Sequence, residues 1–154
     1  MSAINSVLVD RQSIFRVALK SYFNQIDTID INVIGEESTA EGLMLFLHKN
    51  LSTQLAILDL NLPDQDGLEV IPQIRRSFRD MKIMVLTSYG DFKFVGQALK
   101  TGADGYILKS NDPEDLILGI QNIMDGETYI APGLHITPPN GKRLTHGRKS
   151  IYED

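Results

Sequence analysis

Five short, mostly apolar runs alternate along the chain with segments whose apolar residues recur every three or four positions. The apolar runs are residues 6–9, 29–34, 55–59, 82–86 and 105–108. The segments that follow them, whose spacing predicts amphipathic helices, are residues 13–24, 39–49, 67–78, 92–100 and 113–125. A short apolar run is typical of a strand buried on both faces of a parallel sheet. Strands that alternate with helices in this way predict right-handed β-α-β units.

This alternation predicts an α/β fold, namely a doubly wound, five-stranded parallel sheet of flavodoxin-like type with five helices and strand order 2-1-3-4-5. Ser13 is expected to cap the first helix, and Asp112 the last. A brief extended segment is expected at 128–130. Residues 131–154 are rich in proline and glycine and become basic after residue 141, which favours a solvated linker or tail over a nucleic-acid contact.

Polar side chains stand at the ends of four of the predicted strands. They are Asp10, Asp59, Thr87 and Lys109. Because the carboxyl ends of parallel strands meet at one edge of a sheet, we expect these side chains to converge where open α/β sheets bind their ligands. Turn-forming residues follow Asp59, so the chain leaves the sheet there as a loop. Asp59 on its own is equally compatible with a polar strand end that has no function.

Composition narrows the function classes. The chain has 154 residues, a formal net charge of −5 and no cysteine. The negative charge argues against a chain that binds nucleic acid through its whole surface. The lack of cysteine excludes disulfides and thiolate chemistry. No secretory signal or membrane-spanning run is visible, so a cytoplasmic protein with no membrane contact is expected.

The strand ends also carry motifs: VLVD, ILDLNLPDQDGLE, VLTS and GADGYILK occur in this order. With them the chain resembles, over residues 4–130, the receiver domain of response regulators in two-component systems. The stretches SIFRVALKSYF and GADGYILKSNDPEDL are most similar to the NarL/LuxR-type subfamily. The resemblance implies a receiver domain at residues 1–130 that controls a C-terminal, DNA-binding helix-turn-helix domain in a transcriptional regulator. Residues 131–154 are then a linker or tail, and the output domain is absent from this chain.

The resemblance also implies roles for single residues. Asp59 is the expected phosphoacceptor, which receives its phosphoryl group from a histidine kinase. Lys109 and Thr87 are expected to contact the phosphoryl oxygens, and the rotamer of Tyr106 to follow the movement of Thr87. Tyr89 is expected to tune the lifetime of the acyl phosphate by shielding it from water.

A magnesium ion is the implied cofactor, with Asp10, Asp59 and the backbone carbonyl of Asn61 as its oxygen ligands. Asn61 also occupies a position that tunes the lifetime of the phosphate in the family. This sequence departs from the family at Arg11, where members usually carry a second acidic residue that contacts the metal. Arg11 repels the metal and weakens its site, points into solvent, or pairs with Asp59 or a phosphate. Two mechanisms therefore stay open: phosphorylation of Asp59, or an atypical receiver that acts as an interaction or dimerisation module without phosphate.

Other function classes fit less well. A phosphatase of the haloacid-dehalogenase type needs a second aspartate where this chain has Asn61, so no turnover enzyme is expected. Gly141 and Lys142 lack the spacing of a phosphate-binding P-loop. The expected partners are a histidine kinase and a second copy of the chain. A dimer or output-domain contact is expected on the loop after the fourth strand and the helix at 92–100, or on the first and last helices. DNA is expected to bind only through the output domain.

Overall fold

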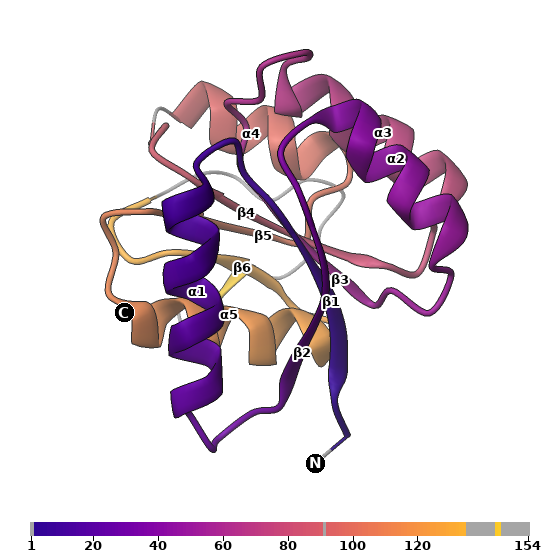
Figure 1. Ribbon diagram of the computed structural model, residues 1–154. Helices are drawn as coiled ribbons and strands as arrows, with labels where there is room; N and C mark the ends of the chain where they lie inside the picture. The colour runs from indigo at the N-terminus through magenta and orange to yellow at the C-terminus, as the bar shows by residue number, and fades with distance from the viewer. Residues whose placement is uncertain (1, 91, 135–143, 146–154) are drawn as a thin grey trace.

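A seven-stranded sheet in which all neighbouring strands are parallel forms the centre of the protein (Figure 1). The computed structural model describes residues 2–90, 92–134 and 144–145. The strands are β1 (Ile4–Val9), β2 (Ile31–Glu37), β3 (Leu55–Leu58), β4 (Lys82–Thr87), β5 (Gly105–Leu108), β6 (Thr128–Ile130) and β7 (Leu144–Thr145). Their spatial order is β2-β1-β3-β4-β5-β6-β7, which confirms the predicted order of the first five.

Five helices cover the two faces of this sheet. They are α1 (Ser13–Gln25), α2 (Ala40–Lys49), α3 (Gly67–Ser77), α4 (Phe92–Thr101) and α5 (Pro113–Met124). Helices α1 and α5 lie on one face, and α2, α3 and α4 lie on the other (Figure 1). Because both faces are covered, the apolar runs of β3 and β4 are buried along almost their whole length, as the sequence predicts.

Several predicted boundaries were wrong, and strand β1 begins at Ile4, two residues earlier than expected. Strand β2 begins and ends later than expected, because it lies at the edge of the sheet and its half-buried end accommodates Glu36 and Glu37. The N-cap position of helix α1 is held by Gln12 and not by Ser13, and the Gln12 side chain forms no capping hydrogen bond. The backbone N–H of Gln12 instead donates to Asp10 Oδ1 at 2.8 Å, so the carboxylate at the end of β1 organises the turn into the helix.

The segment after α5 belongs to the packed domain. Strand β6, predicted as a brief extended segment, pairs with β5. Tyr129, Ile130 and Ala131 are fully buried, and Leu134 is almost so. Strand β7, which the sequence did not indicate, pairs with β6. The remaining part of the predicted tail, 135–143 and 146–154, lies outside the described residues.

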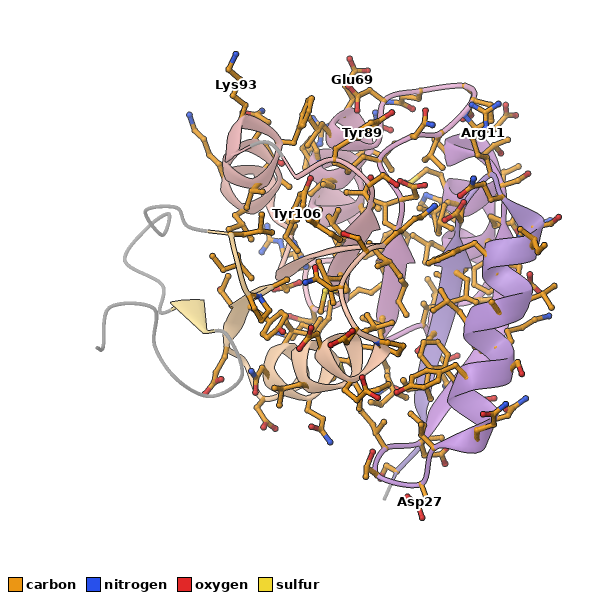
Figure 2. The ribbon with its side chains drawn as sticks, turned by 90° about the vertical axis from the view of Figure 1, so that its left-hand side faces the viewer. Arg11, Asp27, Glu69, Tyr89, Lys93 and Tyr106 are labelled. Atoms are coloured by element: carbon orange, nitrogen blue, oxygen red, sulfur yellow. The ribbon has the colours of Figure 1, made fainter. Side chains whose placement is uncertain are left out.

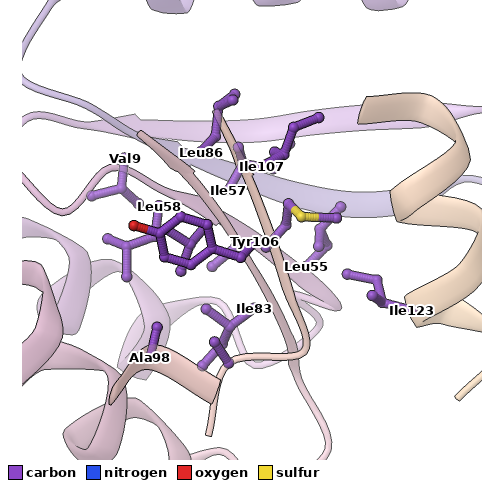
Figure 3. Packing of buried hydrophobic residues seen from close by; sticks show 14 of the residues in the cluster. Val9, Leu55, Ile57, Leu58, Ile83, Leu86, Ala98, Tyr106, Ile107 and Ile123 are labelled. Carbon is purple, nitrogen blue, oxygen red and sulfur yellow. The ribbon is translucent and has the colours of Figure 1, made fainter. Parts of the chain in front are cut away.

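The core on the α4 side of the sheet surrounds Tyr106. Its ring is completely buried and lies near Leu58, Ile83 and Ala98 (Figure 3). The loop from β3 into α3 packs just as closely, because a Cβ at Gly67 would lie 2.5 Å from the Cα of Leu60. Only glycine fits there, so the loop that follows Asp59 is held tightly against the end of β3.

Candidate functional site

The polar residues at the strand ends converge as predicted. Lys109 Nζ lies 2.8 Å from Asp10 Oδ2 and 2.9 Å from Asp59 Oδ2. Asp10 and Asp59 are only 4% and 5% exposed. A buried carboxylate without a compensating partner is costly, so one ammonium that bridges both acids is what allows them to lie together.

Lys109 is held by more than the two carboxylates. Its Nζ also donates to Gln12 Oε1 at 2.7 Å and lies 4.4 Å from the ring centroid of Phe15, a cation–π contact. An ammonium has three N–H donors, and these three oxygens match them in number. Burial alone would lower the pKa of Lys109, but the hydrogen bonds to Asp10 and Asp59 and their charges outweigh burial and raise it. Lys109 is therefore a fixed, protonated cation.

The local backbone orients both carboxylates. Asp10 Oδ1 accepts from the N–H of Gln12, and Asp59 Oδ1 accepts from the N–H of Asn61 at 3.2 Å. These are Asx-type turns, in which an aspartate side chain holds the backbone two residues on. One oxygen of each carboxylate thus binds the backbone, and the other faces Lys109.

A pocket of about 250 Å³ opens above Asp59. It is lined by Arg11, Gln12, Asp59, Asn61, Thr87, Ser88, Tyr89 and Lys109. Thr87 is completely buried, and its hydroxyl has no hydrogen-bond partner among the described residues. Because an unpaired buried hydroxyl costs free energy, Thr87 is placed to bind a group that enters the pocket.

Two tyrosines connect this pocket to the core. The hydroxyl of the buried Tyr106 donates to the backbone carbonyl of Tyr89. The ring of Tyr89 is 40% exposed and packs against Phe94 of α4, with ring centroids 5.5 Å apart. Figure 2 shows Tyr89 and Arg11 at the same end of the domain, opposite Asp27. The loop after β4 is therefore attached to both β5 and α4.

The comparisons with known proteins agree with this geometry. Residues 7–121 match the model of the response regulator receiver domain. The chain belongs to this family. The response regulator protein VraR of Staphylococcus epidermidis is 29% identical over 151 residues, which are 98% of this chain and 69% of VraR. VraR of Staphylococcus aureus is 29% identical over 150 residues, or 97% of this chain and 69% of VraR.

Solved receiver structures share the fold. The isolated receiver domain of RcsB from Salmonella enterica serovar Typhimurium, with the phosphomimetic BeF3−, has a TM-score of 0.77 and 26% identity and covers 85% of this chain and 95% of that one. A LuxR-family response regulator from Aurantimonas sp. has a TM-score of 0.79 and 26% identity, with coverage of 85% and 91%. The resemblance to NarL/LuxR-type receivers is thereby confirmed. The described residues contain no helix long and apolar enough to span a membrane.

Receiver domains generally bind Mg²⁺ in their acidic pocket, and this pocket departs from what such a site needs. Asp10 and Asp59 supply hard oxygen donors, but both already contact Lys109. The third acidic position holds Arg11. Across the residues that the structure describes, no three or more His, Cys, Asp or Glu side chains form a group able to hold a metal. The donors present therefore fall short of a tight magnesium site.

Sequence reasoning missed two residues of the site. Gln12 and Phe15 both contact the ammonium of Lys109, one through its amide oxygen and the other through its ring. Both lie within six residues of Asp10 in the turn and first helical turn after β1. Their position just after Asp10, at the end of β1, is the only feature of the sequence that could have indicated them. A position in the sequence does not reveal in which direction a side chain points.

Proposed function

We propose that Asp59 accepts a phosphoryl group from the phosphohistidine of a histidine kinase. The observation that carries the proposal is a buried carboxylate, 2.9 Å from Lys109, below a pocket into which the unpaired Thr87 hydroxyl opens. An Asp59 oxygen forms a bond to phosphorus while the phosphorus–nitrogen bond breaks, and the imidazole leaves with the electron pair. The domain changes state once per transfer and does not turn over. We place this exchange in the cytoplasm, the compartment typical of response regulators.

In this proposal each neighbouring side chain has a role in the phosphorylated state. Lys109 stays beside the new anion, and the Thr87 hydroxyl donates to a phosphoryl oxygen. Because Tyr106 holds the Tyr89 carbonyl, a shift of the loop after β4 toward the phosphate changes the packing of Tyr106 and α4. The phosphate then favours one of two arrangements of this surface, which is a population shift.

Intact mass after incubation with acetyl phosphate tests the proposal. Wild-type protein and an Asp80→Asn control, in which an exposed acid in the turn before β4 is neutralised, should each gain one phosphoryl group. Asp59→Asn should gain none, because no carboxylate remains at the pocket floor. An adduct of equal yield on Asp59→Asn would refute Asp59 as the acceptor.

The partners that we propose are a second copy of the chain and DNA, by analogy with a relative. One solved RcsB structure is described as two RcsB dimers bound to two parallel DNAs. We propose that the receiver, whose packed sheet extends past the predicted end at residue 130, pairs with a second copy and controls a DNA-binding output domain. The exposed apolar side chains of Ile14 and Val17 on α1 support a second copy, since they are 81% and 58% exposed. Sedimentation velocity before and after phosphorylation tests this pairing.

Tyr89→Ala is expected to shorten the lifetime of the phosphorylated state several-fold. The half-exposed ring borders the pocket, so its removal lets water approach the acyl phosphate. Tyr89→Phe keeps the ring and should hydrolyse at the wild-type rate. The measurement is loss of the phosphoryl adduct over time by intact mass. Equal lifetimes for the alanine variant and wild type would show that Tyr89 does not shield the bond.

A phosphate-independent interaction module is the second candidate, and Arg11 in the pocket is the observation that favours it. It predicts a folded wild-type chain with no adduct under conditions that label an ordinary receiver. Mg²⁺ bound by Asp10, Asp59 and the Asn61 carbonyl stays a prediction of the sequence, with an affinity lowered by Arg11.

A further inference from the structure

Arg11 lies at the mouth of the phosphoacceptor pocket and carries a positive charge. Its side chain is exposed and lines the same pocket as Asp59 and Thr87. It forms no ion pair with any residue that the structure describes, in contrast to Arg16 and Lys109. Figure 2 shows it at the Tyr89 end of the domain. Its guanidinium is therefore available to a ligand of the pocket.

The charges of the pocket balance without a metal. Asp10 and Asp59 are two anions, and Lys109 and Arg11 are two cations, so the four side chains together carry no net charge. With an acid at position 11 the same set would carry two negative charges, which is the charge that a divalent cation cancels. The substitution at this one position therefore changes the pocket by the charge of one divalent ion.

The hydrogen-bond donors of the pocket also favour Arg11 as a ligand of the phosphoryl group. Lys109 already has an oxygen acceptor for each of its three N–H groups, on Asp10, Asp59 and Gln12. Arg11 and the unpaired Thr87 hydroxyl can both donate to an incoming phosphoryl group, and Arg11 is the one charged donor among the lining residues other than Lys109. A guanidinium offers five N–H groups in a planar fork that matches phosphate oxygens, and it is protonated at every physiological pH.

We propose that Arg11 binds the phosphoryl group and supplies the positive charge that a divalent metal supplies in other receivers, so that Asp59 is phosphorylated without a metal. This inference rests on the proposed function of Asp59. With acetyl phosphate as donor, an Asp59 oxygen bonds to phosphorus, the bond from phosphorus to the acetate oxygen breaks, and acetate leaves with the electron pair. Arg11 neutralises the charge on the transferred oxygens during this step.

The test measures the rate of the phosphoryl adduct by intact mass with acetyl phosphate, in excess EDTA and in excess Mg²⁺. Wild type should be labelled at similar rates in both. Arg11→Ala should lose about tenfold or more of the rate in EDTA, the value of one charge-assisted hydrogen bond. Arg11→Asp should be labelled only with Mg²⁺. Titration calorimetry should show tighter Mg²⁺ binding by Arg11→Asp than by wild type, because a ligand replaces a repelling cation.

Four results would contradict the proposal, and they differ in what they leave standing. Wild type labelled only with Mg²⁺, or Arg11→Ala labelled as fast as wild type in EDTA, would overturn the role of Arg11 and leave Asp59 as the acceptor. Labelling of Arg11→Asp with Mg²⁺ while wild type is never labelled would overturn the role of Arg11 and also the phosphorylation of wild-type Asp59, and it would favour the phosphate-independent module. No adduct on any variant would overturn the proposed function itself. Because Arg11 is exposed, all variants should melt close to the wild-type temperature, which is the folding control.

Discussion

Lys109→Met is expected to lower the free energy of unfolding by about 3 kcal/mol at neutral pH. Methionine has nearly the same length but no charge, so Asp10 and Asp59 stay buried beside each other without a cation. Chemical denaturation followed by circular dichroism measures the loss. Lys100→Met, which removes an exposed lysine of α4, is the control and should change stability little.

The Lys109 effect has a defined pH range. The pKa of Lys109 is raised in the folded state, so the folded protein holds this proton more tightly than the unfolded chain. Its contribution is fully present below the ordinary lysine pKa of about 10.4 and is lost as the pH rises through the higher folded value. The stability difference between wild type and Lys109→Met should therefore stay constant from neutral to mildly alkaline pH and shrink only in strong alkali. Equal stability of the two proteins at pH 7 would contradict the bridging role of Lys109.

Tyr129→Ala is expected to cost about 3 to 4 kcal/mol of stability. Tyr129 in β6 is completely buried, and its ring presses so closely on α5 that a Cβ at Gly119 would lie 2.7 Å from it. Removal of the ring leaves a cavity between β6 and α5. The measurement is again the free energy of unfolding from denaturant titration.

Tyr129→Phe is the matched variant, and it isolates the hydroxyl. This hydroxyl is buried and has no hydrogen-bond partner among the described residues, and burial and then the charge of Asp115 raise the pKa of Tyr129. Deleting an unpaired buried hydroxyl should leave stability unchanged or increase it by about 1 kcal/mol. A large loss in the phenylalanine variant would show that the hydroxyl is bonded after all. A small loss in the alanine variant would show that β6 is not part of the domain core.

The fold, and the meeting of polar side chains at one edge of the sheet, could be predicted because both depend on the local order of apolar and polar residues. Apolar runs separated by helical periodicity are enough to indicate a parallel sheet, and such a sheet brings the residues after its strands to one edge. Asp10, Asp59 and Lys109 therefore meet although they lie far apart in the sequence. The predicted boundaries of β2 were wrong, because an edge strand tolerates charged residues that the hydrophobic pattern assigns to a loop.

Contacts that depend on the direction of a side chain, or on an ion pair between distant residues, could not be predicted from the sequence. The contacts of Gln12 and Phe15 with Lys109 require particular rotamers in a turn. The ion pair of Arg75 with Asp104, at 2.8 Å, joins residues from separate β-α units, and charged residues at such positions are common on surfaces. The apolar stretch Tyr129, Ile130 and Ala131 is too short to show that the extended segment predicted at 128–130 is a buried strand of the sheet.

Borohydride trapping of the phosphorylated chain shows which residue carries the phosphoryl group. Reduction of an aspartyl phosphate converts that residue to homoserine, so peptide mass mapping identifies the acceptor. After incubation with acetyl phosphate, we expect homoserine at position 59 and unchanged aspartate at positions 10, 64 and 66. Homoserine at one of those three positions, with Asp59 intact, would contradict it.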